Sequence, residues 1–257
     1  MSRQMEKAKK KMLISQPEPS SGRSPYFSIA ERFGYDIDFR QLIQTVPIDA
    51  VAFRKQRIDP LSYTAFVFTS KTAIDCFFTL LKSMRLTVPE TMKYFCSSEK
   101  IALYLQKYIV YRKRKIFFGE MGHTDELVRL MSKPSHKGER FLIPVGEDGI
   151  SPLVEQLEGS NFNYKSVVAY ETITRPWEDK PDYAYDLVIF FSPYGISAME
   201  ELFPDFNKKK ILIGAFGKLT EDALVKAGMQ PDFTAPTPEY PSMAGALEAF
   251  LASHAEA

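Results

Sequence analysis

A strand-to-helix unit that occurs twice constrains the fold of this chain more than any other feature. Residues 187–191 form an apolar run without polar alternation, and a Ser-Pro-Tyr-Gly turn and a helical pattern follow. Such a run is typical of a strand buried on both faces of a parallel sheet. Residues 63–75 repeat the arrangement, with an apolar strand, a Thr-Ser turn and a second helical pattern. The repeat predicts two α/β lobes, and we expect their turns to border a shared cleft.

The turns matter chemically because a helix that starts directly after a strand has free backbone N–H groups in its first turn. These groups, together with the helix dipole, attract carboxylates and phosphates. Thr69 and Ser70 lie in the turn of the unit at 63–75, and Ser192 lies in the turn after residues 187–191. Thr220 follows the glycine turn 214–217. Hydroxyl groups beside helix starts therefore predict an anion-binding protein.

The remaining segments alternate between strand-like and helical patterns. Residues 36–48 and 164–174 are long segments of extended character, and we expect each to form a long strand and the two to pair as a ribbon. The basic residues 112–115 are expected on a solvated strand edge. The order of elements predicts the α/β fold class with doubly wound parallel sheets.

Composition and charge limit the classes of function. Of the 257 residues, 45% are hydrophobic and 25% are charged, which are ordinary values for a globular protein. The 33 basic and 32 acidic residues leave a net charge of +1, which favours neither nucleic acid nor a membrane surface as partner. No apolar segment suits a signal peptide or a membrane span. Cys76 and Cys96 lie in predicted buried elements, so we expect reduced thiols in a cytoplasmic protein.

The patterns of common catalytic and cofactor sites are missing from the sequence. None of the three histidines has the spacing of a metal ligand, so we expect no metal. Neither a dinucleotide fingerprint nor a Walker loop is present, although Gly214-Ala-Phe-Gly217 is a fragment of a nucleotide-type turn. Neither Ser70 nor Ser192 lies in the G-x-S-x-G pattern of a nucleophile elbow, so we do not expect a serine hydrolase. The residues alone therefore predict a two-lobed anion-binding protein without a cofactor, and they do not specify a reaction.

The order of the motifs resembles that of the uroporphyrinogen-III synthase family over nearly all of the chain, in particular its divergent branch in the Bacteroidetes. Each motif is weak alone, and the resemblance depends on their order. The motifs are Phe68-Thr69-Ser70, Tyr170-Glu171-Thr172, Phe191-Ser-Pro-Tyr-Gly195 and Phe216-Gly-Lys-Leu-Thr220.

The resemblance implies two α/β lobes joined by a two-stranded β ribbon, with one lobe discontinuous in sequence. On this chain the discontinuous lobe would comprise residues 1–40 and 176–257, and the inserted lobe would comprise residues 51–164. Residues 41–50 and 165–175 would form the ribbon linker. The resemblance further implies a monomer.

The activity that the resemblance implies is the conversion of hydroxymethylbilane into uroporphyrinogen III. Water is lost from this linear tetrapyrrole, and the last pyrrole ring is inverted as the chain closes. The partner would be this small molecule, with no cofactor, no nucleic acid and no membrane. The competing hypothesis is a non-catalytic anion- or tetrapyrrole-binding module on the same scaffold, since a fold does not determine a function. A nucleotide-binding protein is a third alternative.

The resemblance also implies roles for individual residues. Tyr170 would assist departure of the substrate hydroxyl, by hydrogen bonding or proton donation. Four hydroxyl-bearing residues would bind the substrate, and two glycines would let the backbone approach it. The alternative for each is ordinary packing, turn or capping duty. The substrate-binding residues are Thr69, Ser70, Ser192, Thr220, Gly195 and Gly217.

The chain departs from the family pattern at two turns. Ser97 and Lys100 stand where the family often has glycine and threonine. Glu147 and Asp148 follow Val145-Gly146, where many members have Arg-Gly. Two acidic residues would repel a polycarboxylate, so we do not assign that second turn to substrate binding.

Overall fold

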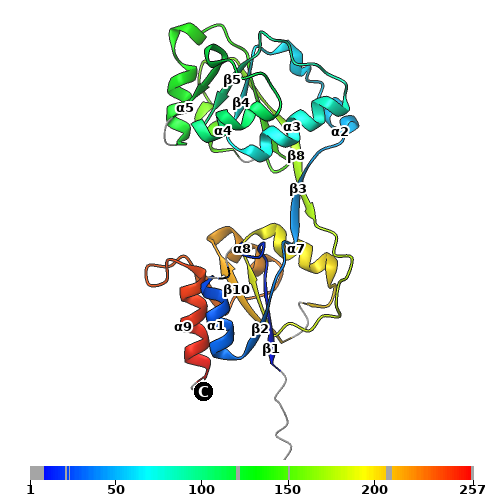
Figure 1. Ribbon diagram of the computed structural model, residues 1–257, viewed down its shortest axis with the longest axis vertical. Coiled ribbons are helices and arrows are strands. Elements are labelled where there is room, and N and C mark those ends of the chain that lie inside the picture. Colours follow the sequence, from blue (N-terminus) through cyan, green and yellow to red (C-terminus); the bar gives the residue numbers. More distant parts are fainter. Residues whose placement is uncertain are drawn as a thin grey trace, which may run out of the picture. The chain divides into compact units, whose positions relative to one another are not determined.

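The structure is a computed structural model that describes residues 9–20, 22, 24–119, 122–149, 151–206 and 210–255. The chain separates into two compact units (Figure 1). The terminal unit comprises Met1–Gln44 and Ile173–Ala257, and the inserted unit comprises Thr45–Thr172. The exact lobe and linker boundaries expected from the sequence stay a prediction.

The terminal unit contains a five-stranded sheet in the order β11-β10-β9-β1-β2, and its strand pairs are parallel. The apolar run at 187–191 supplies the central strand, as predicted, and residues 187–190 of it are fully buried. The strands are β1 (Lys10–Ile14), β2 (Tyr35–Phe39), β9 (Leu187–Phe190), β10 (Leu212–Phe216) and β11 (Phe233–Ala235).

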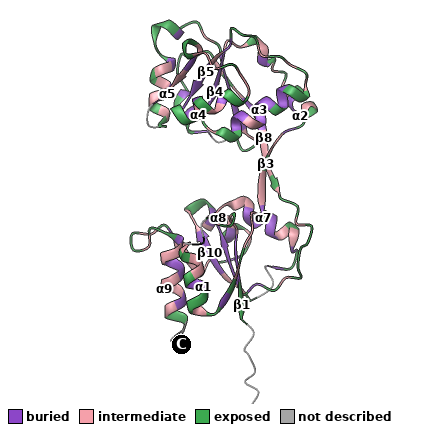
Figure 2. Cartoon of the chain, in the orientation of Figure 1, coloured by how far each residue is buried: buried purple, intermediate pink, exposed green. Residues whose placement is uncertain are grey.

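Helices cover both faces of this sheet. Successive residues of a strand point to opposite faces, so the side chains of β9 enter two different cores. Leu187 and Ile189 pack in a core with α1 (Pro25–Phe33) and α9 (Met243–Ala255). Val188 and Phe190 pack in a second core with α7 (Pro193–Leu202) and α8 (Lys218–Lys226). The central strand β9 is buried and the outer helix faces are exposed (Figure 2).

The inserted unit contains a six-stranded sheet in the order β3-β8-β7-β4-β5-β6. The five strands from β8 to β6 are parallel to one another. The strands are β3 (Ile43–Pro47), β4 (Ala65–Phe68), β5 (Lys93–Cys96), β6 (Ile116–Phe118), β7 (Phe141–Gly146) and β8 (Tyr164–Thr174).

The inserted sheet is also covered on both faces. Phe66 and Phe68 of β4 pack with Phe77 of helix α3 in one core, and Val67 packs with Leu127 of α5 and Leu153 of α6 in the other. The two covered sheets confirm the predicted α/β class with doubly wound parallel sheets. The helices are α2 (Ala50–Lys55), α3 (Lys71–Ser83), α4 (Glu99–Tyr104), α5 (Thr124–Met131) and α6 (Pro152–Leu157).

The prediction of one long strand over residues 36–48 is wrong. The segment forms two strands, of which β2 pairs with β1 and β3 is the neighbour of β8. The Arg175 N–H donates to the Leu42 carbonyl (2.7 Å) and the Ile48 N–H donates to the Ala169 carbonyl (3.1 Å), so β3 and β8 run antiparallel. Alternation alone cannot show where a chain leaves one sheet and enters another. Both strands of this ribbon cross the boundary between the two units.

The expectation that residues 112–115 form a strand edge is also wrong. Lys113–Lys115 form a short 3-10 helix ahead of β6. Within the described residues, no helix is long and apolar enough to cross a membrane.

Candidate functional site

Each sheet has one edge at which its parallel strands end, and turns bearing hydroxyl groups follow the strands there. In open α/β sheets, ligands bind at the carboxyl ends of the strands. We call these edges the carboxyl edge of the inserted unit and the carboxyl edge of the terminal unit.

At the carboxyl edge of the inserted unit, Thr69 and Ser70 lie between β4 and α3, as predicted. The Ser70 hydroxyl caps α3 by accepting a hydrogen bond from the Ala73 N–H (3.0 Å). Thr69 is exposed, and Lys71 begins the helix beside it. The hydroxyl of Ser70 therefore has a structural bond, whereas the side chain of Thr69 faces solvent.

Ser97, one of the departures from the family pattern, connects two turns of this edge. It is only 4% exposed, and its hydroxyl donates to the Thr69 carbonyl (3.3 Å) while its N–H donates to the Phe68 carbonyl (3.1 Å). A glycine here would lose the hydroxyl bond. Lys100 is exposed on α4 and adds positive charge to the unit. Sequence reasoning did not identify the structural role of Ser97.

Tyr170 lies at an irregularity in the pairing of β7 and β8. Val145 pairs with Val168 and Gly146 pairs with Tyr170, so Ala169 has no opposite residue. A bulge of this kind changes the direction of a side chain and is frequent next to active sites. A Cβ atom on Gly146 would lie 3.1 Å from the Tyr170 Cε2 atom. The tyrosine ring therefore lies against the backbone at a position that suits glycine.

The environment of Tyr170 keeps its hydroxyl protonated. Burial raises the pKa of this phenol, and the Asp148 carboxylate raises it further. A raised pKa means that the neutral phenol, which can donate a hydrogen bond or a proton, is the form present at neutral pH. Among the described residues, no protein group is hydrogen-bonded to the hydroxyl. Tyr170 is thus an available donor.

The acidic turn after β7 has an internal role. The Glu147 carboxylate accepts a hydrogen bond from the Thr172 N–H (3.3 Å), and the Gly149 N–H donates to the Gly146 carbonyl (3.0 Å). The first bond connects the turn to the strand that carries Tyr170. One of the two acidic side chains is therefore engaged with the backbone, and the other contributes to the raised pKa of Tyr170.

At the carboxyl edge of the terminal unit, two serines lie after neighbouring strands. The Ser192 hydroxyl caps α7 by accepting from the Tyr194 N–H (3.3 Å). The Ser15 hydroxyl, at the end of β1, accepts from the Phe191 N–H (3.3 Å). Ser15 was not predicted as a site residue, although its position directly after the first strand was a usable signal.

Gly195 is buried in the first turn of α7, and its N–H donates to the Ser192 carbonyl (3.0 Å). A Cβ atom there would make ordinary contacts, 3.5 Å from Phe190 and 3.7 Å from the Ser15 hydroxyl. The structure thus gives this glycine a packing position. Its predicted contact with a substrate stays a prediction.

The turn before α8 requires glycine and leaves backbone donors exposed. Gly217 has a φ of +86°, which residues with a side chain rarely adopt, and its N–H donates to the Ala235 carbonyl (2.6 Å). Thr220 is only 2% exposed, so its side chain lies under the turn. Lys218 and Leu219 are exposed, and their N–H groups have no partner within the helix. The first two N–H groups of α8 are therefore the donors that this turn offers.

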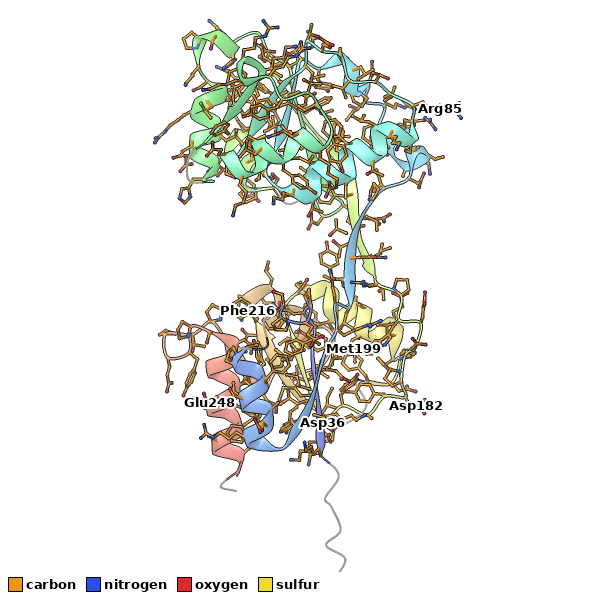
Figure 3. All side chains as sticks on the ribbon, viewed as in Figure 1. Asp36, Arg85, Asp182, Met199, Phe216 and Glu248 are labelled. Atoms are coloured by element: carbon orange, nitrogen blue, oxygen red, sulfur yellow. The ribbon has the colours of Figure 1, made fainter. Side chains whose placement is uncertain are left out.

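An aromatic pair lies between the two turns of the terminal unit. The rings of Phe191 and Phe216, which follow and end adjacent strands, have centroids 5.6 Å apart and are half-buried. Figure 3 labels Phe216 on the side of the unit where β10 ends. The pair adds an apolar surface beside Ser192 and Gly217, which sequence reasoning missed.

The chemistry that these groups support is binding and proton donation. Hydroxyls and helix-start amides can bind carboxylates, and Tyr170 can donate. Within the described residues, no three His, Cys, Asp or Glu side chains are grouped as metal ligands would be.

Comparisons with known proteins identify the family to which this arrangement corresponds. The family model described as "Uroporphyrinogen-III synthase HemD" matches residues 26–245, which is well over half of the chain. No curated protein matches the sequence significantly.

Solved structures of the same description resemble the chain. The uroporphyrinogen-III synthetase of Helicobacter pylori has a TM-score of 0.56 and 19% sequence identity, with 95% of this chain and 99% of that chain covered. This likeness is evidence for the fold. A mutant uroporphyrinogen III synthase of Thermus thermophilus has a TM-score of 0.45 and 16% identity, with 96% and 100% of the two chains covered.

We predict that Gly146 and Tyr170 are energetically coupled. Gly146→Ala should destabilise the inserted unit by about 1–3 kcal/mol, because the added Cβ displaces a packed ring. In combination with Tyr170→Ala, the same substitution should cost less, with a coupling energy of roughly 0.5–3 kcal/mol. Urea denaturation of the four proteins of this cycle measures the coupling. Additive effects would show that the ring does not lie against Gly146.

Proposed function

The chain belongs to the uroporphyrinogen-III synthase family, and we propose that it catalyses the reaction of that family with residues of the two carboxyl edges. It is an enzyme of porphyrin biosynthesis that acts on a linear tetrapyrrole. The reaction is the cyclisation and dehydration of hydroxymethylbilane to uroporphyrinogen III, with inversion of the last ring. The observation that supports the residue assignment best is the protonated, unengaged hydroxyl of Tyr170 at a strand bulge.

The main demand of this reaction is orientation of the substrate. Loss of the substrate hydroxyl gives a reactive azafulvene, which closes spontaneously to the wrong isomer. A catalyst must therefore hold the chain ends so that the inverted ring closes instead, and this is a proximity effect. Strong nucleophiles are unnecessary, which agrees with a site made of hydroxyls and amides.

The acetate and propionate arms of the substrate are the groups to be bound. We assign the inserted-unit contacts to the Thr69 side chain and to the backbone N–H groups at the start of α3, directly after Ser70. We assign the terminal-unit contacts to Ser192 and to the backbone after Gly217, where N–H groups without a helical partner begin α8. Helix starts bind carboxylates through such groups.

Two predicted binding residues act indirectly in this proposal. Thr220 is buried, so it supports the α8 turn and its hydroxyl does not reach the substrate. Gly195 is buried in the first turn of α7, where its N–H donates to the Ser192 carbonyl. Both residues therefore position the groups that bind.

Tyr170 serves as the donor to the departing hydroxyl. Because burial and Asp148 raise its pKa, the phenol is protonated throughout the physiological range. Glu147 holds the end of its strand through the Thr172 N–H. We further propose a cytoplasmic monomer that needs no cofactor, and the free, buried thiols of Cys76 and Cys96 support a reducing compartment.

The first prediction for this proposal concerns the product. Purified protein incubated with hydroxymethylbilane should give the III isomer, and chromatography of the oxidised porphyrins separates it from the I isomer. Formation of the I isomer alone, as in a reaction without protein, would instead support the non-catalytic binding module.

A second prediction concerns Tyr170. Tyr170→Phe should lower kcat by about 10- to 100-fold. This loss is at or below the smallest rate effect usual for a general acid, because the substrate also loses its hydroxyl spontaneously. Since the pKa of the phenol is raised, wild-type activity should be independent of this group from neutral pH up to about 10, the ordinary pKa of tyrosine. Unchanged turnover in the phenylalanine variant would remove the assigned role.

A third prediction separates capping from substrate binding at Ser192. Ser192→Ala should cost about 1 kcal/mol of stability through loss of the cap. Ser192→Asp keeps a capping oxygen, so its stability should stay near that of the wild type. The aspartate would nevertheless repel a substrate carboxylate and raise KM more than alanine does. Equal KM values for the aspartate variant and the wild type would place the substrate elsewhere.

A further inference from the structure

A second concave surface lies at the opposite end of the inserted sheet. A cavity of about 930 Å³ is lined by the amino ends of β5 and β6, the last turns of α3 and the segments 85–90 and 107–112. None of the residues assigned to the carboxyl edge lines it. Its volume is near the upper end of the range for small-molecule sites. We call it the amino-edge cavity.

The floor of the amino-edge cavity is apolar and partly aromatic. Leu81, Met92 and Ile116 are almost fully buried beneath it. The rings of Phe78 and Tyr108 are stacked, with centroids 4.8 Å apart and an angle of 11° between their planes. A flat apolar body would lose its contact with water on such a surface, and this burial would favour its binding.

The position of Tyr108 is fixed by hydrogen bonds. Its hydroxyl donates to the Asp75 carboxylate (2.5 Å), which also accepts from Tyr104 (2.8 Å) and from the Lys107 ammonium (2.9 Å). Burial raises the pKa of Asp75, but these bonds outweigh it and hold the pKa below the ordinary value. The aspartate therefore stays ionised and keeps the ring in place. The aromatic part of the floor is thus preformed.

The rim of the cavity is positively charged. Lys82, Arg85, Lys107, Arg112 and Lys115 line it, with Glu90 as the acidic lining residue. Lys107 is paired with Asp75 and Arg112 with Glu90, both at 2.9 Å. In the described part of the chain, no carboxylate lies within ion-pair distance of the other three. The rim therefore carries uncompensated positive charge over an apolar floor.

Arg85 occupies a backbone position that normally favours glycine. It follows the end of α3 with a φ of +59°. The Leu86 N–H bonds to the Leu81 carbonyl (2.9 Å) and the Arg85 N–H bonds to the Lys82 carbonyl (3.0 Å), which is a Schellman helix end. Figure 3 shows the Arg85 side chain projecting outward from the ribbon. An arginine in this conformation is strained.

We propose that the amino-edge cavity binds a flat aromatic molecule that carries several carboxylate groups. The apolar floor takes the aromatic body, and the cations of the rim take the carboxylates through charge-assisted hydrogen bonds. A mononucleotide or a single aromatic ring would leave much of the volume empty. A carboxylated porphyrin has the required shape and charge, and that choice of ligand rests on the proposed function; the ligand class itself does not.

Two fluorescent probes test the proposal. Pyrene-1,3,6,8-tetrasulfonate is a flat aromatic tetra-anion that is unrelated to the substrate, and coproporphyrin I is a porphyrin with four carboxylates. Fluorescence anisotropy should show binding of both to the full-length protein. Affinity should fall with added salt because the rim is exposed. Uncharged pyrenemethanol measures how much of the affinity comes from the apolar floor without the charges of the rim.

Arg85→Gly is the decisive variant, because it removes one of the unpaired rim charges and also relieves the positive φ. It should fold at least as well as the wild type and bind both anionic probes about tenfold more weakly. Arg57→Gly is its matched control, since Arg57 is also exposed, also has a positive φ (+55°) and lies in the same unit outside the cavity. That variant should bind as the wild type does.

The outcomes separate this proposal from the proposed function. Binding of pyrenetetrasulfonate that depends on Arg85 but not on Arg57 supports the cavity, whichever isomer the protein forms from hydroxymethylbilane. Equal affinity in wild type and Arg85→Gly, or equal weakening in both glycine variants, would overturn it, because the anions would then bind elsewhere or through general charge. Pyrenetetrasulfonate binding without coproporphyrin binding would overturn the porphyrin as ligand.

Discussion

Parallel pairing of strands that are buried on both faces is the constraint on which the rest of this structure depends. A parallel strand needs a crossover to its neighbour, so a helix follows most strands and the turns before these helices collect at one edge of the sheet. The chain does this twice, around β9 in the terminal unit and around β4 in the inserted unit. Helix starts and hydroxyl groups are therefore brought together in both units without any local motif for a ligand. The same geometry places the ends of the helices at the opposite edge.

The polar residues at the carboxyl edges show how structural and chemical roles overlap. Ser70 and Ser192 cap helices, Ser15 accepts from the Phe191 N–H, and Ser97 holds the turn after β4. Each bond pairs a backbone N–H or carbonyl group that would otherwise bond to water or stay unpaired. The capping hydroxyls of Ser70 and Ser192 keep their own O–H to donate, and a ligand can also use Thr69, the next N–H groups of each helix and the hydroxyl of Tyr170. A substitution at a capping serine changes both stability and binding, which is why variants that keep the cap are informative.

The sequence predicted the parts of the fold that follow from hydrophobic pattern and turn chemistry. The apolar runs at 65–68 and 187–190 are central strands, and the helix starts after them lie where the turns indicated. Features that depend on pairing were beyond the pattern. The bulge at Ala169 in the β7–β8 pairing and the division of residues 36–48 between two sheets depend on the neighbouring strand. The burial of Thr220 depends on how the α8 turn closes, so a hydroxyl that looked available from sequence is covered.

Helix α3 links the two edges of the inserted unit within one rigid element. Ser70 caps its start at the carboxyl edge, and Arg85 follows its end at the rim of the amino-edge cavity. The helix has 13 residues, so its ends are about 20 Å apart. Seven of those residues are buried against the sheet and its neighbours, so the helix moves as one body if it moves at all. A ligand at the amino-edge cavity can therefore affect the carboxyl edge only by favouring a different position of the whole helix, since close-packed cores switch between discrete arrangements.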